Sequence, residues 1–250
     1  MMNNMTDTVK QLLIINVLFF IGSYFVPQAN ELLSLHYFES DGFKFWQPIT
    51  HMFMHGSLMH IFFNMFALVS FGSALEHFWG AKKFLFFYLS CGIGAALIHT
   101  GVNYYEFHNA QNILLQQGVS VVDIQTLLRG GSININNPDT VLIQKYVNQM
   151  GDAYNTPTVG ASGAIYGLLV AFAVMFPNAE LALMFIPVPI KAKYFVPLIV
   201  LLDLFSGVTG ISLFGGGNIA HFAHVGGALI GFIMMWYWKR NQFDKNRWDR

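Results

Sequence analysis

The sequence has very little charge. Aspartate, glutamate, lysine and arginine make up 10% of its 250 residues, against about 25% in an ordinary soluble domain. The acidic and basic residues balance to a formal net charge of zero, so the chain offers no basic field for a nucleic acid. Cysteine is equally scarce, and the single Cys91 excludes an intrachain disulfide framework and a zinc site built from several cysteines. These shortages argue against a soluble enzyme, a disordered scaffold and a nucleic-acid-binding protein.

Apolar residues are abundant instead. They make up 54% of the chain and include 25 phenylalanines and 12 methionines, and the chain also has 23 glycines. The mean hydropathy is +0.47. Glycine is tolerated in membrane helices because it allows close approach of backbones. Six stretches are apolar and long enough to cross a bilayer. They are residues 11–27, 56–77, 83–102, 161–177, 193–213 and 219–238. The sequence therefore predicts an all-α, polytopic membrane protein with a single six-helix membrane domain over 1–250 that lies in the lipid bilayer.

The basic residues predict the topology. Ten of them fall on one side of the six spans, and Lys44, Arg129 and Lys145 fall on the other. The positive-inside rule then makes the ten-residue side, which carries both termini, cytoplasmic. The loops 28–50, 103–160 and 214–218 face outward. No small-residue cleavage site follows the first span, so we interpret it as a retained helix rather than a signal peptide.

The outward segment 103–154 is the only stretch with soluble character. Its charged residues stand among short apolar clusters, which predicts two or three short amphipathic helices interrupted at Gly130-Gly131 and Asn137-Pro138. Asp139 or Thr140 is able to cap the last of them. We favour a spacer on the membrane surface over a binding module for this insertion between spans 3 and 4.

The first polar cluster stands on the second span. Polar groups inside a span are costly and mark candidate functional sites. His60 and Asn64 are four residues apart and share a helix face, as two donors around one substrate oxygen would. His51 and His55 precede them. Taken alone, the pair is better explained as hydrogen bonding between helices.

The second cluster opens the fourth span. Ser162 lies between Gly160 and Gly163 at a helix start, where free backbone N–H groups and the helix dipole stabilise an oxyanion. Gly163 and Gly167 also form a Gly-x-x-x-Gly packing pair, which explains the glycines but not the serine. The sequence is not the Gly-x-Ser-x-Gly elbow of α/β-hydrolases, because Ala164 takes the last glycine position.

The third cluster opens the sixth span. Gly227 and Gly231 form a second Gly-x-x-x-Gly pair, so the fourth and sixth helices are able to approach closely. Such an approach is what a Ser/His dyad requires. His221 and His224 share roughly one face. Periodicity does not choose between them, although His224 lies nearer the glycine stripe.

Together these motifs resemble the rhomboid intramembrane serine proteases, of bacterial type, from Trp46 to Gly231. Gly160-x-Ser162-Gly163 resembles the nucleophile motif of that family, and His224 with its two following glycines resembles the motif of the final helix. The resemblance implies that Ser162 is the nucleophile and His224 the general base and acid. It also implies supporting roles for the remaining motif residues, Gly160, Gly163, Tyr166, Gly227 and Gly231.

The same resemblance implies an oxyanion site formed by His60, Asn64 and the backbone N–H of Ser162. Tyr166 matches the residue whose ring supports the catalytic imidazole, and Gly72 to Gly80 resembles a structural motif at the end of the second helix. The expected activity is endoproteolysis of transmembrane or membrane-anchored substrates near the outer face, in a bacterial inner membrane, without cofactor, metal or nucleic acid.

Two departures from the family pattern are the pair Trp46-Gln47 and the insertion 103–154, which is longer than the corresponding loop in the simplest relatives. Many rhomboids carry Trp-Arg in the first outward loop, whereas this chain has Trp46-Gln47, which puts the stability of that loop in doubt. Asp203 lies between Ser162 and His224 in the chain, the order of an α/β-hydrolase triad. Because rhomboids use a dyad, we expect Asp203 to bond another helix or His221 instead.

Two other functions remain open. The histidines His51, His55 and His60 could ligate a metal or haem, although His-Glu-x-x-His is absent and no carboxylate stands among them. Alternatively, the chain is a catalytically inactive rhomboid-like protein that acts in binding or trafficking. The presence of all four residues of the expected site argues against that alternative.

Overall fold

The computed structural model describes residues 5–133, 139–183, 186–211 and 220–245. The described residues are mostly helical, which confirms the predicted all-α class. The elements in chain order are α1 (Asp7–Phe25), α2 (Gln28–Leu33), α3 (Gln47–Thr50), η2 (His51–Phe53), α4 (Leu58–Ala67), η3 (Leu68–Gly72), α5 (Ser73–Trp79), α6 (Ala81–Gln116), α7 (Val121–Leu128), α8 (Thr140–Asn155), α9 (Ser162–Met175), β1 (Glu180–Leu183), β2 (Ile186–Lys191), α10 (Ala192–Thr209) and α11 (His221–Lys245).

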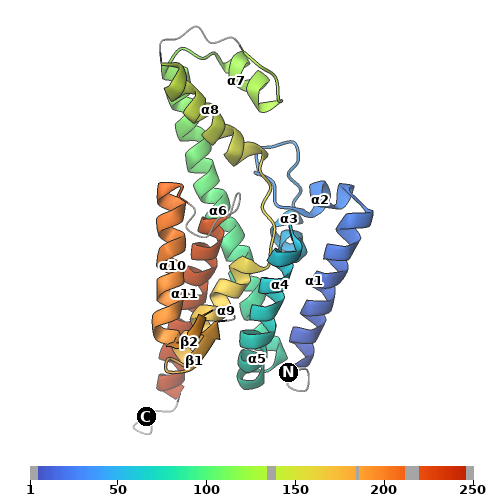
Figure 1. The fold of residues 1–250 in the computed structure, drawn as a ribbon, viewed down its shortest axis with the longest axis vertical. Helices are drawn as coiled ribbons and strands as arrows, with labels where there is room; N and C mark the ends of the chain where they lie inside the picture. The colour runs from blue at the N-terminus through green and yellow to red at the C-terminus, as the bar shows by residue number, and fades with distance from the viewer. Residues whose placement is uncertain (1–4, 134–138, 184–185, 212–219, 246–250) are drawn as a thin grey trace.

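The long helices form an upright bundle in which α1 begins and α11 ends at the same end (Figure 1). Within the described residues, four segments are long and apolar enough to cross a membrane: α1, the continuous run from α4 to α5, α6 and α10. The shorter apolar helix α9 lies inside the bundle beside α11. The count of six spans stays a prediction, and the expected loop 214–218 falls outside the described residues.

Helix α6 is longer than the sequence pattern indicates. We predicted a span over 83–102, but the helix has 36 residues, which is about 54 Å at 1.5 Å per residue. Because the hydrocarbon core of a bilayer is only about 30 Å thick, α6 carries the chain well beyond it. The helix ends before Gly118, whose φ of +85° suits glycine.

The outer part of α6, together with α7 and α8, forms an outer arm above the bundle (Figure 1). The arm has its own hydrophobic core, separate from that of the bundle. Tyr37 of the first outward loop contributes to this core, and its other buried residues are Phe107, Ala110, Leu114, Val119, Ile124, Ile143, Met150 and Ala153. The segment 103–154 thus comprises the outer part of α6 together with α7 and α8. Its predicted place on the membrane surface stays a prediction.

Glu76 attaches α1 to the second span. Its carboxylate accepts hydrogen bonds from the backbone N–H groups of Thr8, at 3.1 Å, and Val9, at 3.0 Å, and from the hydroxyl of Thr6. The first N–H groups of a helix have no partner within it and carry a partial positive charge. The Glu76 carboxylate therefore caps α1, and Gly80, at φ +76°, ends α5 one turn later.

Gln47 stabilises the first outward loop without an arginine. Its side chain is fully buried, and its amide oxygen accepts from the backbone N–H groups of His36, at 3.2 Å, and Lys44, at 3.1 Å. Its amide nitrogen donates to the carbonyl oxygen of Gly42 at 3.0 Å. The neighbouring Trp46 indole donates to the carbonyl oxygen of Leu32 at 2.8 Å. Neutral hydrogen bonds thus stabilise the first outward loop, although the arginine of the Trp-Arg pair is absent from this sequence.

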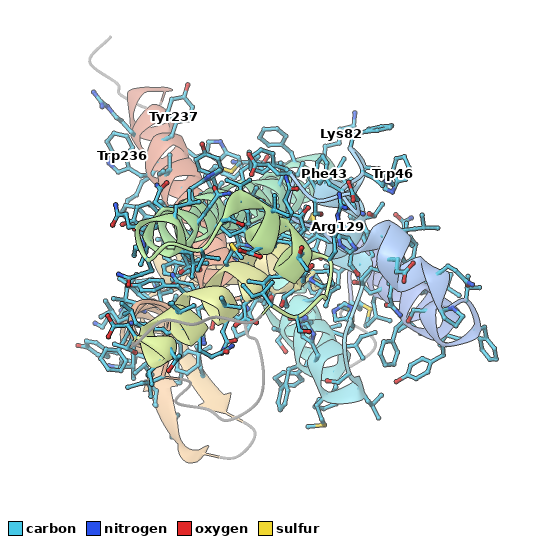
Figure 2. All side chains as sticks on the ribbon, turned by 90° about the horizontal axis from the view of Figure 1, so that it is seen from above. Phe43, Trp46, Lys82, Arg129, Trp236 and Tyr237 are labelled. Atoms are coloured by element: carbon cyan, nitrogen blue, oxygen red, sulfur yellow. The ribbon has the colours of Figure 1, made fainter. Side chains whose placement is uncertain are left out.

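A small antiparallel hairpin, β1–β2, connects α9 and α10, with Glu180 paired to Lys191. Seen from above, the hairpin projects from the edge of the bundle (Figure 2). In the same view Trp236 and Tyr237 point away from the bundle, and both are more than half exposed. Exposed tryptophan and tyrosine are typical of helix surfaces at a membrane interface.

Candidate functional site

The segment that leads into α9 is held by backbone hydrogen bonds. Leu35 and Thr158 form an isolated bridge with N···O distances of 2.9 and 2.8 Å, and the N–H of Gly160 donates to the carbonyl oxygen of His51 at 2.9 Å. Two residues later Ser162 begins α9. The first outward loop therefore fixes where Ser162 stands at the helix start.

Gly160 occupies a position that only glycine suits. Its φ is +125°, and a Cβ there would lie 2.8 Å from the Nε2 of His60 and 3.6 Å from the Oγ of Ser162. A side chain would therefore meet both strain and a collision. Because the space is empty, the imidazole of His60 lies directly against the backbone that precedes Ser162.

The two Gly-x-x-x-Gly pairs face each other across α9 and α11. A Cβ on Gly231 would stand 2.8 Å from the Cα of Gly167, and a Cβ on Gly227 would collide with the backbone of Gly163. The helix backbones are thus in direct contact, as the two glycine pairs predict.

This contact brings Ser162 and His224 together. The Oγ of Ser162 and the Nε2 of His224 are 2.8 Å apart, within hydrogen-bond range for a nucleophile and its base. The ring of Tyr166 stacks on His224 with centroids 4.4 Å apart and planes 11° apart. The Nδ1 of His221 hydrogen-bonds the carboxylate of Asp203 instead, so the geometry favours His224 of the two histidines.

Asp203 on α10 touches more of the site than the sequence indicated. Its Oδ1 lies 2.6 Å from the Nδ1 of His221, the partner we expected, and 3.2 Å from the Nδ1 of His224. Its Oδ2 accepts from the hydroxyl of Tyr166. Sequence reasoning noted the chain order of a triad but expected Asp203 to bond another helix or His221, so the contact with His224 is the difference.

His60 and Asn64 lie on α4. Asn64 is 6% exposed, and its amide nitrogen has no hydrogen-bond partner among the described residues. The ring of His60 packs edge-on against His55, with centroids 5.0 Å apart. The N–H groups of the first turn of α9 also lack partners within that helix. Unpaired donors therefore occur at the places where the sequence predicts an oxyanion site.

The histidines of the metal or haem alternative, His51, His55 and His60, do not form a group of potential metal ligands within the described residues. His51 and His55 are buried, and loss of hydration lowers the pKa of each from 6.5 to about 4. The Nδ1 of His51 bonds the carbonyl oxygen of Gln47 at 2.9 Å. Among the described residues, the group of potential metal ligands whose donor atoms lie within 4.8 Å of one another is Asp203, His221 and His224, not the histidines of the second span.

Comparisons with known proteins show the family to which the chain belongs. The family model of the Rhomboid domain matches residues 42–241. An uncharacterized mitochondrial rhomboid protein of Schizosaccharomyces pombe is 27% identical over 79% of this chain and 52% of its own length. The human mitochondrial presenilin-associated rhomboid-like protein is 25% identical over 94% of this chain and 49% of its own length. The mitochondrial rhomboid protein 1 of Saccharomyces cerevisiae is 25% identical over 74% of this chain and 39% of its own length. The chain thus spans about half the length, or less, of the curated relatives it matches.

These relatives contradict the expected location. We predicted a bacterial inner membrane with both termini in the cytoplasm, but all three relatives are named as mitochondrial. The prediction was wrong because an uneven distribution of lysine and arginine indicates which side of a membrane a loop faces, and not which membrane it is. The multi-pass membrane character is supported by the long apolar helices.

Proposed function

This chain belongs to the rhomboid family, and on that premise we propose that it is an intramembrane serine endopeptidase. Its substrates would be transmembrane or membrane-anchored proteins, cleaved near the membrane face from which the outer arm projects. Ser162 would be the nucleophile and His224 the general base and acid. The observation that supports this proposal most strongly is the 2.8 Å separation of the Ser162 Oγ and the His224 Nε2 at the start of α9.

The reaction would follow the usual course of acyl transfer. The Oγ of Ser162 attacks the scissile carbonyl carbon while its proton moves to the Nε2 of His224. The C–N bond then breaks, and His224 gives that proton to the leaving amine. Water attacks the acyl-enzyme in the second half, His224 takes a proton from it, and the proton returns to the Oγ of Ser162 as the acid leaves.

The tetrahedral intermediate carries a negative oxygen, which is costly in an apolar environment unless donors surround it. Three donors would serve: the imidazole of His60, the amide of Asn64 and the backbone N–H of Ser162. The buried, unpaired amide nitrogen of Asn64 supports this role. Removing a single donor of this kind costs about 10²–10³ in kcat in other serine hydrolases.

The test is cleavage of a transmembrane reporter by the full chain reconstituted in lipid. We expect wild type to cleave, and Ser162→Ala and His224→Ala to be inactive while they keep the thermal stability of wild type. A serine-directed phosphonate should label Ser162, and a metal chelator should not change the cleavage rate. Cleavage by Ser162→Ala would refute the proposal. Absence of both cleavage and labelling in folded wild type would favour a catalytically inactive rhomboid-like protein.

The relatives' names also lead us to propose a mitochondrial membrane as the location. Density-gradient fractionation of cells that express a tagged chain tests this. The tagged chain should migrate with a mitochondrial membrane marker, and migration with any other membrane would contradict the proposal.

A further inference from the structure

Three side chains converge on one carboxylate next to the proposed dyad. Asp203 lies on α10, Tyr166 on α9, and His221 and His224 on α11. The Tyr166 hydroxyl donates to one carboxylate oxygen, and the Nδ1 atoms of His221 and His224 lie 2.6 and 3.2 Å from the other. The side chains of Asp203 and His224 are 11% and 14% exposed. The cluster therefore joins three helices in a site with little access to water.

The carboxylate determines which nitrogen of each imidazole carries the proton. An ionised carboxylate only accepts hydrogen bonds, so His224 must present its Nδ1–H to Asp203. The Nε2 of His224 then keeps its lone pair, and this is the atom that lies 2.8 Å from the Ser162 Oγ. In the other tautomer the Nε2 would carry a hydrogen and could not accept the serine proton.

We propose that Asp203 is the positioning residue for His224, which extends the proposed Ser162/His224 dyad to a Ser162–His224–Asp203 triad. Asp203 holds the imidazole in the tautomer that accepts the serine proton, and it stabilises the imidazolium that forms after transfer. This inference rests on the proposed function and adds a third residue to it.

The surroundings of Asp203 explain how a carboxylate is retained within a span. An unpaired charge there is expensive, but three donors on its two oxygens favour the ionised form. Tyr166 has two functions in this arrangement, because its hydroxyl holds the carboxylate while its ring stacks on the imidazole that the carboxylate orients. His221 provides the third donor through its Nδ1, which lies 2.6 Å from the Oδ1 of Asp203.

The same residues are a less suitable metal site. Two ligands of a tetrahedral ion bound at about 2.0–2.1 Å stand roughly 3.3 Å apart. The 2.6 Å between the Nδ1 of His221 and the Oδ1 of Asp203 is a hydrogen-bond distance. Hydrogen bonding within the cluster, rather than a shared ion, is therefore the arrangement that the distances favour.

The test compares Asp203→Asn with wild type and with a control on the same helix, Thr209→Val. Both changes keep the size of the side chain. Thr209 is exposed, and within the described part of the chain its hydroxyl donates to the carbonyl oxygen of Phe205 and accepts from the N–H of Ile211, near the end of α10. With the chain reconstituted in lipid, we expect Asp203→Asn to lower kcat for a transmembrane reporter by about 10²–10⁴-fold, since the wrong tautomer costs about 10⁴ in the serine protease template. KM should change by less than about twofold, because Asp203 does not touch substrate. Thr209→Val should match wild type.

Two further measurements separate positioning from a loss of fold. Nitrogen-15 spectra of labelled histidine should show an Nδ1–H tautomer for His224 in wild type and a mixture in Asp203→Asn. Tyr166→Phe, which removes only the hydroxyl, should give a kcat between those of wild type and Asp203→Asn. If Asp203→Asn does not fold, Tyr166→Phe tests the proposal in its place, and an unchanged kcat would contradict it.

Unchanged kcat and an unchanged tautomer in Asp203→Asn would overturn the triad. A loss confined to KM, or inhibition of wild type by a chelator, would overturn it as well. Ser162→Ala distinguishes the two proposals. If Ser162→Ala is inactive while Asp203→Asn is fully active, only the triad fails, and if Ser162→Ala still cleaves, the protease proposal itself fails.

Discussion

Adding one methyl group to Gly227 should separate the proposed nucleophile from its base. In Gly227→Ala the new carbon would stand 2.6 Å from the carbonyl carbon of Gly163 and 3.0 Å from its Cα. Since unbonded carbons pack at about 3.5–4.0 Å, α9 and α11 must move apart by roughly 1 Å. A shift of that size would lengthen the contact between Ser162 and His224 to about 3.8 Å, beyond hydrogen-bond range.

The expected result is a large loss of activity with a smaller loss of stability. A displacement of 1 Å at reacting groups costs about 100-fold in rate, and overpacking costs about 1–3 kcal/mol of unfolding free energy. The assay is initial-rate cleavage of a transmembrane reporter in lipid, alongside thermal unfolding. The control is Gly101→Ala, because a Cβ on that glycine of α6 meets no atom within 4 Å. Wild-type cleavage by a folded Gly227→Ala protein would refute the claim that glycine contact between the two helices aligns the site.

Four further predictions concern the surroundings of the site. Gln47→Ala should lower the free energy of unfolding by about 1–3 kcal/mol per buried group left unpaired, and equal melting temperatures for the variant and wild type would contradict the role of that side chain in the loop. Glu76→Gln should weaken the capping of α1 and speed proteolysis at the start of that helix, whereas an unchanged cleavage pattern would argue against a capping role. The pKa of His51 is about 4 in the folded chain and 6.5 ordinarily, so the unfolded chain binds more protons between these pH values. The free energy of unfolding should therefore fall as pH decreases from 6.5 to 4. The His51→Gln variant should show a smaller fall, and an equal fall in both proteins would contradict this role. Cys91 is fully buried, so a maleimide should label it only at the rate of unfolding, and rapid labelling of folded protein would contradict the packing of α6 against α9.

The sequence predicted features that follow from residue spacing within a helix better than contacts that depend on how separate helices pack. The glycine pairs of α9 and α11 are visible as a spacing of four residues, and they indicated correctly that these helices touch. The choice of His224 over His221 also followed from the nearby glycines. By contrast, the contact between Asp203 and His224 depends on how α10 lies beside α11, which no local pattern reports.

Two features of the fold were missed for local reasons. The apolar pattern of α6 ends near residue 102, but no proline interrupts the polar residues that follow, so the helix continues to Gln116. The hairpin contains Pro187 and Pro189 in β2, and proline argues against a strand because it lacks a backbone donor. The polarity of residues after 102 suggested that the helix ends there, and the prolines suggested that no strand forms at 186–191.

The central claim is that His224 activates Ser162 for attack on a peptide carbonyl. The most direct measurement is the rate at which a serine-directed phosphonate labels the reconstituted protein, with the modified residue located by mass spectrometry. We predict that wild type is labelled at Ser162 alone, that Ser162→Ala is not labelled, and that His224→Ala is labelled at least about 100-fold more slowly, since general base catalysis contributes about 10²–10⁴-fold. Labelling of His224→Ala at the wild-type rate, or of a residue other than Ser162, would contradict the account.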